Sequence, residues 1–473
     1  MARLLTPEDF GLVAFAIIIV TFIEAARGFG VNDALIYTSE DVDKAADTAF
    51  IINVVLGIAQ FALAYALSPL LVNVFDDDRI VEIVRVISLV FVFNGFGQTH
   101  DALLQKELQF RKRFLPEIIG TVFKGISSIA LAVAGFGVWS LVIGQLVGAA
   151  TRTVAKWLVL RWWPRFRFYP QQARLLWNYG VQILLFEILS IALDQADQTL
   201  IGTMIGQVQL GYYSIGVRIP EMVIANFSLV LTRVLFPAYT KLKDNIAGLT
   251  NAFLATTKYT AFITVPAGFG MAAVAPELIL VVYGPKWEES IILLQVLAFL
   301  GMVATLPWSA GDVLKALGRP DISTRLLMVE ALYTFPMIYL FVAESRLAVM
   351  ASLANLIALC ITTVLRLYVT SRFLNINPLV FFKLFRSPFL SAGAMFAAVT
   401  LWRNALSGSP LVLILLTSII LGAIVYAALL WIMEKRDILS ARDMLVSLMK
   451  NRKDEDDEDD EDSDLAASND PVA

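Results

Sequence analysis

The chain has 473 residues, of which 58% are hydrophobic and only 16% charged, and this composition excludes an ordinary soluble domain. One cysteine, Cys360, and one histidine, His100, exclude an intramolecular disulfide and leave little for a zinc site or a Cys–His nucleophile. The formal net charge of −4 is unevenly distributed, because the tail from Asp454 to Ala473 holds eleven acidic residues and no lysine or arginine. Such a like-charge block is typical of a disordered, solubilising tail.

The chain opens with a turn, Thr6-Pro7-Glu8-Asp9, and apolar stretches of about 20 residues follow it along the chain. These stretches predict an all-α polytopic membrane protein. The thirteen predicted spans lie near residues 10–32, 47–75, 80–104, 114–135, 136–163, 176–204, 211–238, 255–283, 290–317, 322–343, 346–372, 387–403 and 410–433. Their connections are too short to hold a folded domain outside the membrane.

Lysine and arginine gather in alternate loops of this predicted bundle. Residues 106–113, 161–174, 315–325 and 366–386 are rich in them, as is the segment after residue 434, whereas the intervening loops carry few. Because basic loops remain in the cytoplasm, we expect these loops and the C-terminus to be cytoplasmic. Thirteen spans then place Met1 outside.

Two pairs of similar segments indicate an internal repeat, as many transporters have. The opening "LLTPEDFGLVAFA" resembles "TMIGQVQLGYYSI" from Thr203, which aligns Gly11 with Gly211. Likewise "HDALLQKELQFRKRF" resembles "GDVLKALGRPDISTR", which aligns Asp101 with Asp312. Both offsets are near 200 residues, so we expect two homologous halves. The second copy has a full span before its turn, and by analogy one helix is missing ahead of Met1.

Ionisable residues inside spans are costly, so they are the first candidates for function. Lys124 lies near the middle of the span at 114–135, and we expect it either to line a cavity that attracts phosphate or to pair with a structural acid. Glu24 and Arg27 are three residues apart on one helix face, which fits a local ion pair as well as a cavity wall.

Three acids, Glu187, Asp194 and Asp197, form one stripe on the span at 176–204. This stripe predicts a hydrated cavity wall or pairing with a base on another helix, and a cation-coupling site is the sharper alternative. Arg218 and Glu221 flank Pro220, where we expect a kink that could serve gating.

For the other charged residues we expect structural roles. Asp312 with Lys315, and Asp101 with Lys106, are predicted to be turn pairs. For Arg152, Lys156 and Lys258, interfacial anchoring is the simpler reading.

The segments "ARLLTPEDFGLVA", "DQTLIGTMIGQVQLGYYSIGVRIPE" and "RVLFPAYTKLKDN" resemble the Wzx-type polysaccharide transporter family of the multidrug/oligosaccharidyl-lipid/polysaccharide (MOP) flippase superfamily. The resemblance covers the chain up to about residue 433, although the family has a helix before "ARLLTPEDFG" that is absent here. It implies two six-helix lobes in pseudo-twofold, MATE-like repeat plus two C-terminal helices. The implied domains are residues 1–163 (N-terminal lobe), 164–375 (C-terminal lobe), 376–433 (helix pair), 434–453 (basic amphipathic segment) and 454–473 (disordered acidic tail).

The resemblance also implies a function. Such proteins flip undecaprenyl-pyrophosphate-linked oligosaccharides from the cytoplasmic to the periplasmic leaflet of the inner membrane by alternating access. No cofactor is implied, and coupling to Na⁺ or H⁺ stays open. The expected partners are the lipid-linked oligosaccharide, membrane lipids, a polysaccharide polymerase and an initiating glycosyltransferase.

Three alternatives compete with this interpretation. A membrane enzyme, such as a polymerase, ligase or glycosyltransferase, is disfavoured because the outer loops are short and nearly free of ionisable clusters. A peptidoglycan-precursor flippase or a cation-coupled drug antiporter would share the fold. An inactive, truncated relative is the third.

Overall fold

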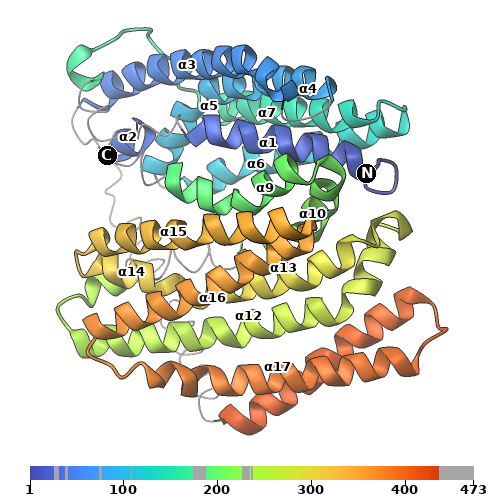
Figure 1. Cartoon of the computed structure of the whole chain (residues 1–473). Coiled ribbons are helices and arrows are strands. Elements are labelled where there is room, and N and C mark those ends of the chain that lie inside the picture. The colour runs from blue at the N-terminus through green and yellow to red at the C-terminus, as the bar shows by residue number, and fades with distance from the viewer. Residues whose placement is uncertain are drawn as a thin grey trace, which may run out of the picture.

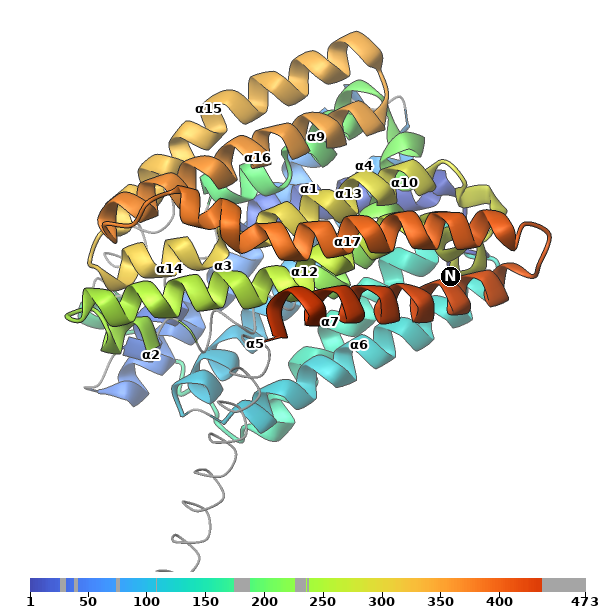
Figure 2. The same cartoon turned by 90° about the horizontal axis from the view of Figure 1, so that it is seen from below.

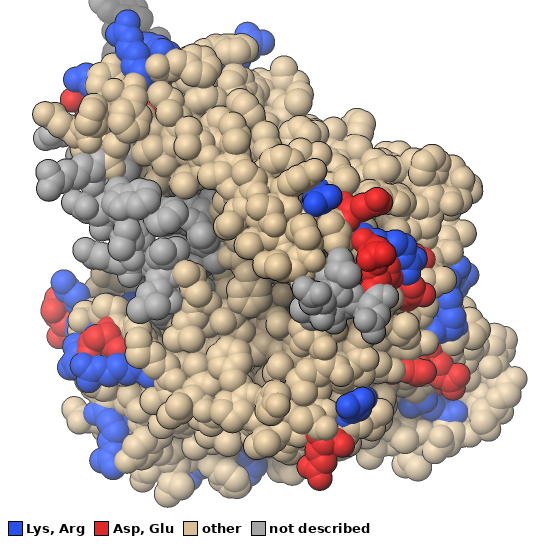
Figure 3. Space-filling model, turned by 45° about the horizontal axis from the view of Figure 1, so that its top comes forward, with Lys and Arg blue, Asp and Glu red and all other residues tan. Residues whose placement is uncertain are grey.

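The computed structural model describes residues 1–25, 31–37, 41–73, 77–107, 109–173, 188–225, 235 and 238–435. Throughout these residues the regular elements are helices, and ten of them are long and apolar enough to cross a membrane. The predicted all-α polytopic class is therefore confirmed. Charged side chains gather toward two ends of the molecule, with a broad band of other residues between them (Figure 3). This distribution is the one that a bilayer requires.

Most of the helices form two groups that lie one above the other in Figure 1, with α9 and α10 between them. The first group, here the N lobe, comprises α1 (Pro7–Ala25), α2 (Val31–Tyr37), α3 (Val42–Leu67), α4 (Arg79–Ile87), α5 (Leu89–Lys106), α6 (Phe110–Val133) and α7 (Val138–Val159). The second, here the C lobe, comprises α9 (Ala196–Met204), α10 (Gln207–Pro220), α12 (Ile246–Val282), α13 (Ser290–Thr305), α14 (Trp308–Ala316), α15 (Pro320–Ser345) and α16 (Ala348–Phe373).

Two further helices, α17 (Leu379–Ala405) and the last helix (Leu411–Lys435), lie beyond α12 (Figures 1 and 2). Two ion pairs join them to α12. Arg403 Nε lies 2.8 Å from Glu277 Oε1, and Lys258 Nζ lies 2.7 Å from Glu434 Oε2. Lys258 is thus an ion-pair partner rather than the interfacial anchor expected from the sequence.

Each of the thirteen predicted spans overlaps a described helix, but the count itself stays a prediction. The stretches at 10–32, 176–204 and 211–238 are not among the ten candidate spans. The stretch at 290–317 is interrupted between α13 and α14, where Pro307 precedes the second helix. At Pro220, where the sequence predicts a kink, α10 ends and a π-helical turn, Glu221–Ala225, follows. From residue 436 on, the predicted amphipathic segment and acidic tail lie outside the described residues.

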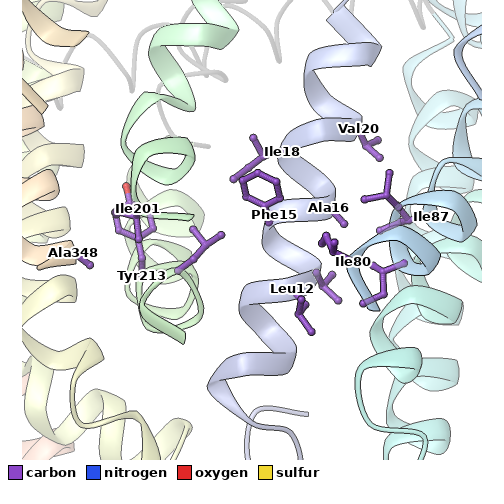
Figure 4. Packing of buried hydrophobic residues seen from close by; sticks show 14 of the residues in the cluster. Leu12, Phe15, Ala16, Ile18, Val20, Ile80, Ile87, Ile201, Tyr213 and Ala348 are labelled. Carbon is purple, nitrogen blue, oxygen red and sulfur yellow. The ribbon is translucent and has the colours of Figure 1, made fainter. Parts of the chain in front are cut away.

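The largest apolar core joins the two lobes (Figure 4). Helix α1 lies at its centre, with Ile80 and Ile87 of α4 on one side and Ile201 and Tyr213 of the C lobe on the other. Phe15 and Ile18 of α1 point toward the C lobe in this view. Burial of this apolar surface stabilises the association of the two lobes.

Helices α1 and α10 cross at two glycines. A Cβ atom added to Gly11 would lie 1.7 Å from the Gln207 carbonyl oxygen, and one added to Gly211 would lie 1.8 Å from the Pro7 carbonyl oxygen. The crossing is therefore reciprocal, and only glycine at both positions permits it. The two residues that the internal repeat aligned are thus in contact across the lobe boundary.

Polar contacts surround this crossing at the end of the bundle marked N in Figure 1, here the clasp end. Arg79 donates to Glu8 and Asp77, and Gln207 of the C lobe donates to Asp77 over 3.2 Å. The guanidinium of Arg79 is the main cause that lowers the pKa of Asp77 from its ordinary value. These contacts tie the N-lobe loop before α4 to the first residue of α10 in the C lobe.

The reverse connection is made by the loop between α12 and α13. Lys286 Nζ donates to the Arg3 carbonyl over 3.0 Å, and Trp287 Nε1 donates to the Ala2 carbonyl over 2.9 Å. The Trp287 ring also meets Phe10 edge-on, with centroids 5.2 Å apart. Contacts from each lobe thus reach the other and hold the two lobes together at the clasp end.

Candidate functional site

Lys124 lies on the face of α6 that packs on α7. A Cβ atom at Gly148 would be 2.8 Å from Lys124 Cβ, so this glycine lets the lysine stem lie against the backbone of α7. The residue is partly buried. Among the described residues its ammonium group makes no hydrogen bond or ion pair. The predicted acidic partner is therefore not seen there.

A second cation without a hydrogen-bonding or ion-pair partner in the described ranges, Arg218, comes from the other lobe. It lies in the last turn of α10 and is exposed. The charges of Arg218 and Arg152 both act on Lys124. Lys124 and Arg218, two of the predicted site residues, are thus close enough for their like charges to interact. Glu221 is exposed and is close enough to interact with Arg218.

A row of alternating charges crosses α5, α6 and α7 beside this site. Arg113 pairs with Asp101 at 2.9 Å, and Asp101 with Lys156 at 3.2 Å. Lys156 also forms an ion pair with Glu117 at 3.4 Å, and Glu117 forms one with Arg152 at 3.1 Å. We call these five residues the charge ladder.

Sequence reasoning missed the ladder. Asp101 pairs with Arg113 and Lys156 rather than with Lys106, and Lys156 is buried rather than anchored at the membrane surface. The only hint in the sequence was that all five charges fall within or beside apolar stretches. The predicted Asp312–Lys315 pair is present, with 3.7 Å between the charged groups.

The C lobe contains a cavity of about 420 Å³ lined by acids. Asp197 is only 2% exposed there. Its carboxylate accepts hydrogen bonds from the Tyr213 hydroxyl, from Asn355 Nδ2 over 2.8 Å and from the backbone N–H of Gln198 over 2.7 Å. These donors hold a carboxylate that has no basic partner among the described residues.

The other acids of the cavity differ in their surroundings. Asp194 and Glu221 are exposed, while Glu330 pairs with Arg366 at 2.7 Å. The Thr334 hydroxyl, buried in the same lining, has no hydrogen-bond partner within the described ranges. Asp194 and Asp197 thus share a cavity wall, whereas Glu187, the third acid of the predicted stripe, lies outside the described residues. These described ranges contain no cluster of three or more His, Cys, Asp or Glu that could hold a metal ion.

The predicted pairing of Glu24 with Arg27 stays a prediction, because Arg27 lies outside the described residues. Glu24 accepts a hydrogen bond from Asn94 Nδ2 over 3.2 Å. Deeper in the N lobe, Asn53 donates to Asn32 over 3.0 Å and to Thr99 over 3.1 Å. These neutral amides and hydroxyls are one part of the polar core of this lobe, which also buries Asp47, His100 and Lys156.

Residues 1–292 match the family described as polysaccharide biosynthesis protein. The chain belongs to this family. Curated polysaccharide biosynthesis proteins that it resembles include teichuronic acid biosynthesis protein TuaB of Bacillus subtilis (strain 168), 28% identical over 64% of this chain. Lipopolysaccharide biosynthesis protein WzxC of Escherichia coli (strain K12) is 25% identical, with 78% of this chain and 75% of WzxC covered. Succinoglycan biosynthesis transport protein ExoT of Rhizobium meliloti (strain 1021) is 25% identical, with coverages of 71% and 68%.

The match to TuaB spans 63% of that protein, which is less than two thirds of its length. Among solved structures, the inward closed conformation of lipid II flippase MurJ superposes with a TM-score of 0.75 at 15% identity, covering 92% of this chain and 94% of MurJ. An inward-facing multidrug MATE transporter of the MOP superfamily gives 0.65 at 14% identity, with coverages of 79% and 92%. This chain therefore has the MOP fold, which the resemblance in its sequence predicted.

Proposed function

We propose that the protein flips a diphosphate-linked lipid oligosaccharide from the inner to the outer leaflet of the inner membrane, for export of a surface polysaccharide. The names of WzxC, ExoT and TuaB, and the flippase MurJ with the same fold, support this class of cargo. The proposal includes a polymerase and an initiating glycosyltransferase as partners, and no catalytic step by this chain.

One observation carries the proposal: Lys124 and Arg218, which come from different lobes, make no hydrogen bond or ion pair within the described part of the chain. Cations left unpaired within a membrane are costly and are retained for a ligand. A diphosphate supplies the missing negative charge, and the guanidinium of Arg218 suits its geometry. The sugar head needs a hydrated path, whereas the lipid tail stays in the bilayer.

The loop charges orient this site in the membrane. The basic segments at 109–113, 161–173 and 315–325 lie at the end opposite the clasp end (Figures 1 and 2), so we infer that they and residue 435 face the cytoplasm. The clasp end then faces outward. The crossing of Gly11 and Gly211 closes it, and the cargo enters from the inner leaflet. An inside-negative potential favours outward movement of the anionic head by about 2.3 kcal/mol per charge per 100 mV.

For coupling, we propose that Asp197 binds H⁺ or Na⁺. Its carboxylate is buried without a basic partner in the described chain, so a cation or proton would relieve the cost of its charge. Thr334 and Asn355 add oxygen atoms to the same cavity wall. A cation-coupled exporter of another substrate is the second candidate, and it rests on this acidic cavity alone.

Complementation tests the proposal in a strain that lacks its own exopolysaccharide flippase. We expect the chain to restore surface polysaccharide, Lys124→Ala to fail, and Lys124→Arg to restore part of the signal. Arg325→Ala, which removes an exposed cation elsewhere, is the matched control. If the Lys124→Ala protein reaches the membrane and restores the polysaccharide fully, the proposed role of the cations is wrong.

A further inference from the structure

The charge ladder ends at the cation site. Gly120 of α6 and Gly148 of α7 lie in contact, and Lys124 and Arg152 each follow one of them by one helical turn. A Cβ atom added to Gly148 would lie 2.8 Å from Lys124 Cβ, and one added to Gly120 would lie 2.9 Å from Arg152 Cβ. The charge of Arg152 also acts on Lys124. Arg152 is therefore both the last rung of the ladder and a neighbour of the unpaired lysine.

The rungs of the ladder differ in burial. The side chains of Lys156 and Asp101 are 9% and 18% exposed, whereas those of Arg152 and Glu117 are 37% and 42% exposed. Water weakens an exposed ion pair far more than a buried one. The Lys156–Asp101 rung is thus a fixed structural contact, and the Arg152–Glu117 rung is the one that another anion can displace.

Two features make that displacement inexpensive. Glu117 lies 3.4 Å from Lys156 as well as 3.1 Å from Arg152, so it keeps a counter-ion after leaving Arg152. Arg152 uses Nη1 for Glu117, while its Nε is buried and has no partner within the described ranges. The guanidinium therefore retains donors for a bidentate contact with a phosphate.

We propose that Arg152 is a third cation of the anion site and that Glu117 is its exchangeable counter-ion, which phosphate oxygens of the cargo replace. The inference rests on the proposed function and assigns two residues that it did not include. In the empty site Glu117 holds Arg152 in place. When a diphosphate arrives, Arg152 joins Lys124 and Arg218 around it, and Glu117 stays with Lys156.

Binding of inorganic diphosphate to the purified full-length protein tests this exchange. We would measure its affinity by calorimetry at one low, fixed salt concentration. Removing the competing carboxylate by Glu117→Gln should tighten binding by about fivefold, the upper range for an exposed ion pair. Arg152→Gln should weaken binding about tenfold, and Arg152→Lys should fall between it and the native protein, because a lysine lacks the fork.

Glu344→Gln is the matched control, since it removes an exposed acid at the far end of α15. It should change the affinity less than twofold. If Glu117→Gln proves unstable, Glu117→Asp shortens the reach of the carboxylate and should tighten binding in the same direction. Unchanged or weaker binding in the Glu117 variants, or unchanged binding in Arg152→Gln, overturns the inference.

The outcome is separable from that of the proposed function. A protein that restores surface polysaccharide but binds no diphosphate overturns the anion exchange alone. A protein that binds diphosphate with the expected ranking but restores no polysaccharide counts against the proposed transport and leaves the exchange standing.

Discussion

The two lobes differ in where they place their charged residues. Asp101 and Asp312 are 211 positions apart, and the same offset aligns α6 with α15 and α7 with α16. At this offset the ladder residues Glu117, Arg152 and Lys156 correspond to uncharged residues of the C lobe: Met328, Thr363 and Leu367. The charge ladder is therefore a feature of the N lobe alone.

The converse holds for the acidic cavity. The C-lobe pair Glu330 and Arg366 corresponds to Ile119 and Ala155 of the N lobe, and Asn355, which binds Asp197, corresponds to Gly144. Along this alignment the cations of the charge ladder belong to the N lobe, and the buried carboxylate of Asp197 belongs to the C lobe. The Gly11–Gly211 crossing, by contrast, is reciprocal between the two lobes.

The largest expected effect comes from the buried part of the ladder. Lys156→Met leaves the carboxylates of Asp101 and Glu117 without their shared cation, and we expect a loss of about 3–5 kcal/mol in the free energy of unfolding. Thermal unfolding in detergent measures it as a lower midpoint. Leu367→Met, the corresponding change in the C lobe, should cost less than about 1.5 kcal/mol. Equal losses in the two variants would contradict the difference between the lobes.

The second-largest effect is expected at the crossing of α1 and α10, where Gly11 and Gly211 meet. Gly211→Ala places a methyl group against the Pro7 carbonyl, and overpacking of this kind costs about 1–3 kcal/mol. The closed clasp end should open, which increases labelling of a cysteine at Gln207 by a membrane-impermeant reagent in a Cys360→Ala background. The control is Gly393→Ala, whose added methyl group meets nothing within 4 Å. Unchanged labelling in Gly211→Ala would show that the crossing does not hold this end shut.

The sequence predicted the features that depend on local pattern. Hydropathy located the helices, a kink was predicted at Pro220, where α10 ends, and charges within apolar stretches singled out Lys124, Arg218 and Asp197. The ladder could not be predicted, because Glu117 and Arg152 are 35 residues apart and only packing brings them together. For the same reason Lys156, near a helix end, was interpreted as an interfacial anchor, although α5 and α6 enclose it in carboxylates.

A smaller effect is expected in the acidic cavity. Asp197→Asn keeps the shape of the side chain but removes the charge, so the fold should persist while stimulation of transport by a Na⁺ or H⁺ gradient falls about tenfold. Transport in vesicles with and without each gradient measures this. The same substitution in the N lobe, Asp101→Asn, should leave the gradient response of the remaining folded protein unchanged. A gradient response that survives in Asp197→Asn would place coupling elsewhere.

The smallest effect concerns a single hydrogen bond. Tyr213→Phe removes one donor to Asp197, while Asn355 and the Gln198 amide remain. We expect a loss of about 1 kcal/mol in the free energy of unfolding, seen as a slightly lower thermal midpoint. Asp197→Asn/Tyr213→Phe should cost less than the sum of the single changes, because the two groups share that bond. Strict additivity would mean that the bond does not form.

Flipping by the purified protein in liposomes tests the central claim most directly. The cargo would be a fluorescent oligosaccharide on a short-chain prenyl diphosphate, and a membrane-impermeant quencher would report the fraction in the outer leaflet. We predict that the native protein equilibrates the cargo between leaflets and that Lys124→Ala/Arg218→Ala does not, although both reconstitute equally. Equal rates for the two proteins would contradict the claim that cations from both lobes hold the diphosphate during transport.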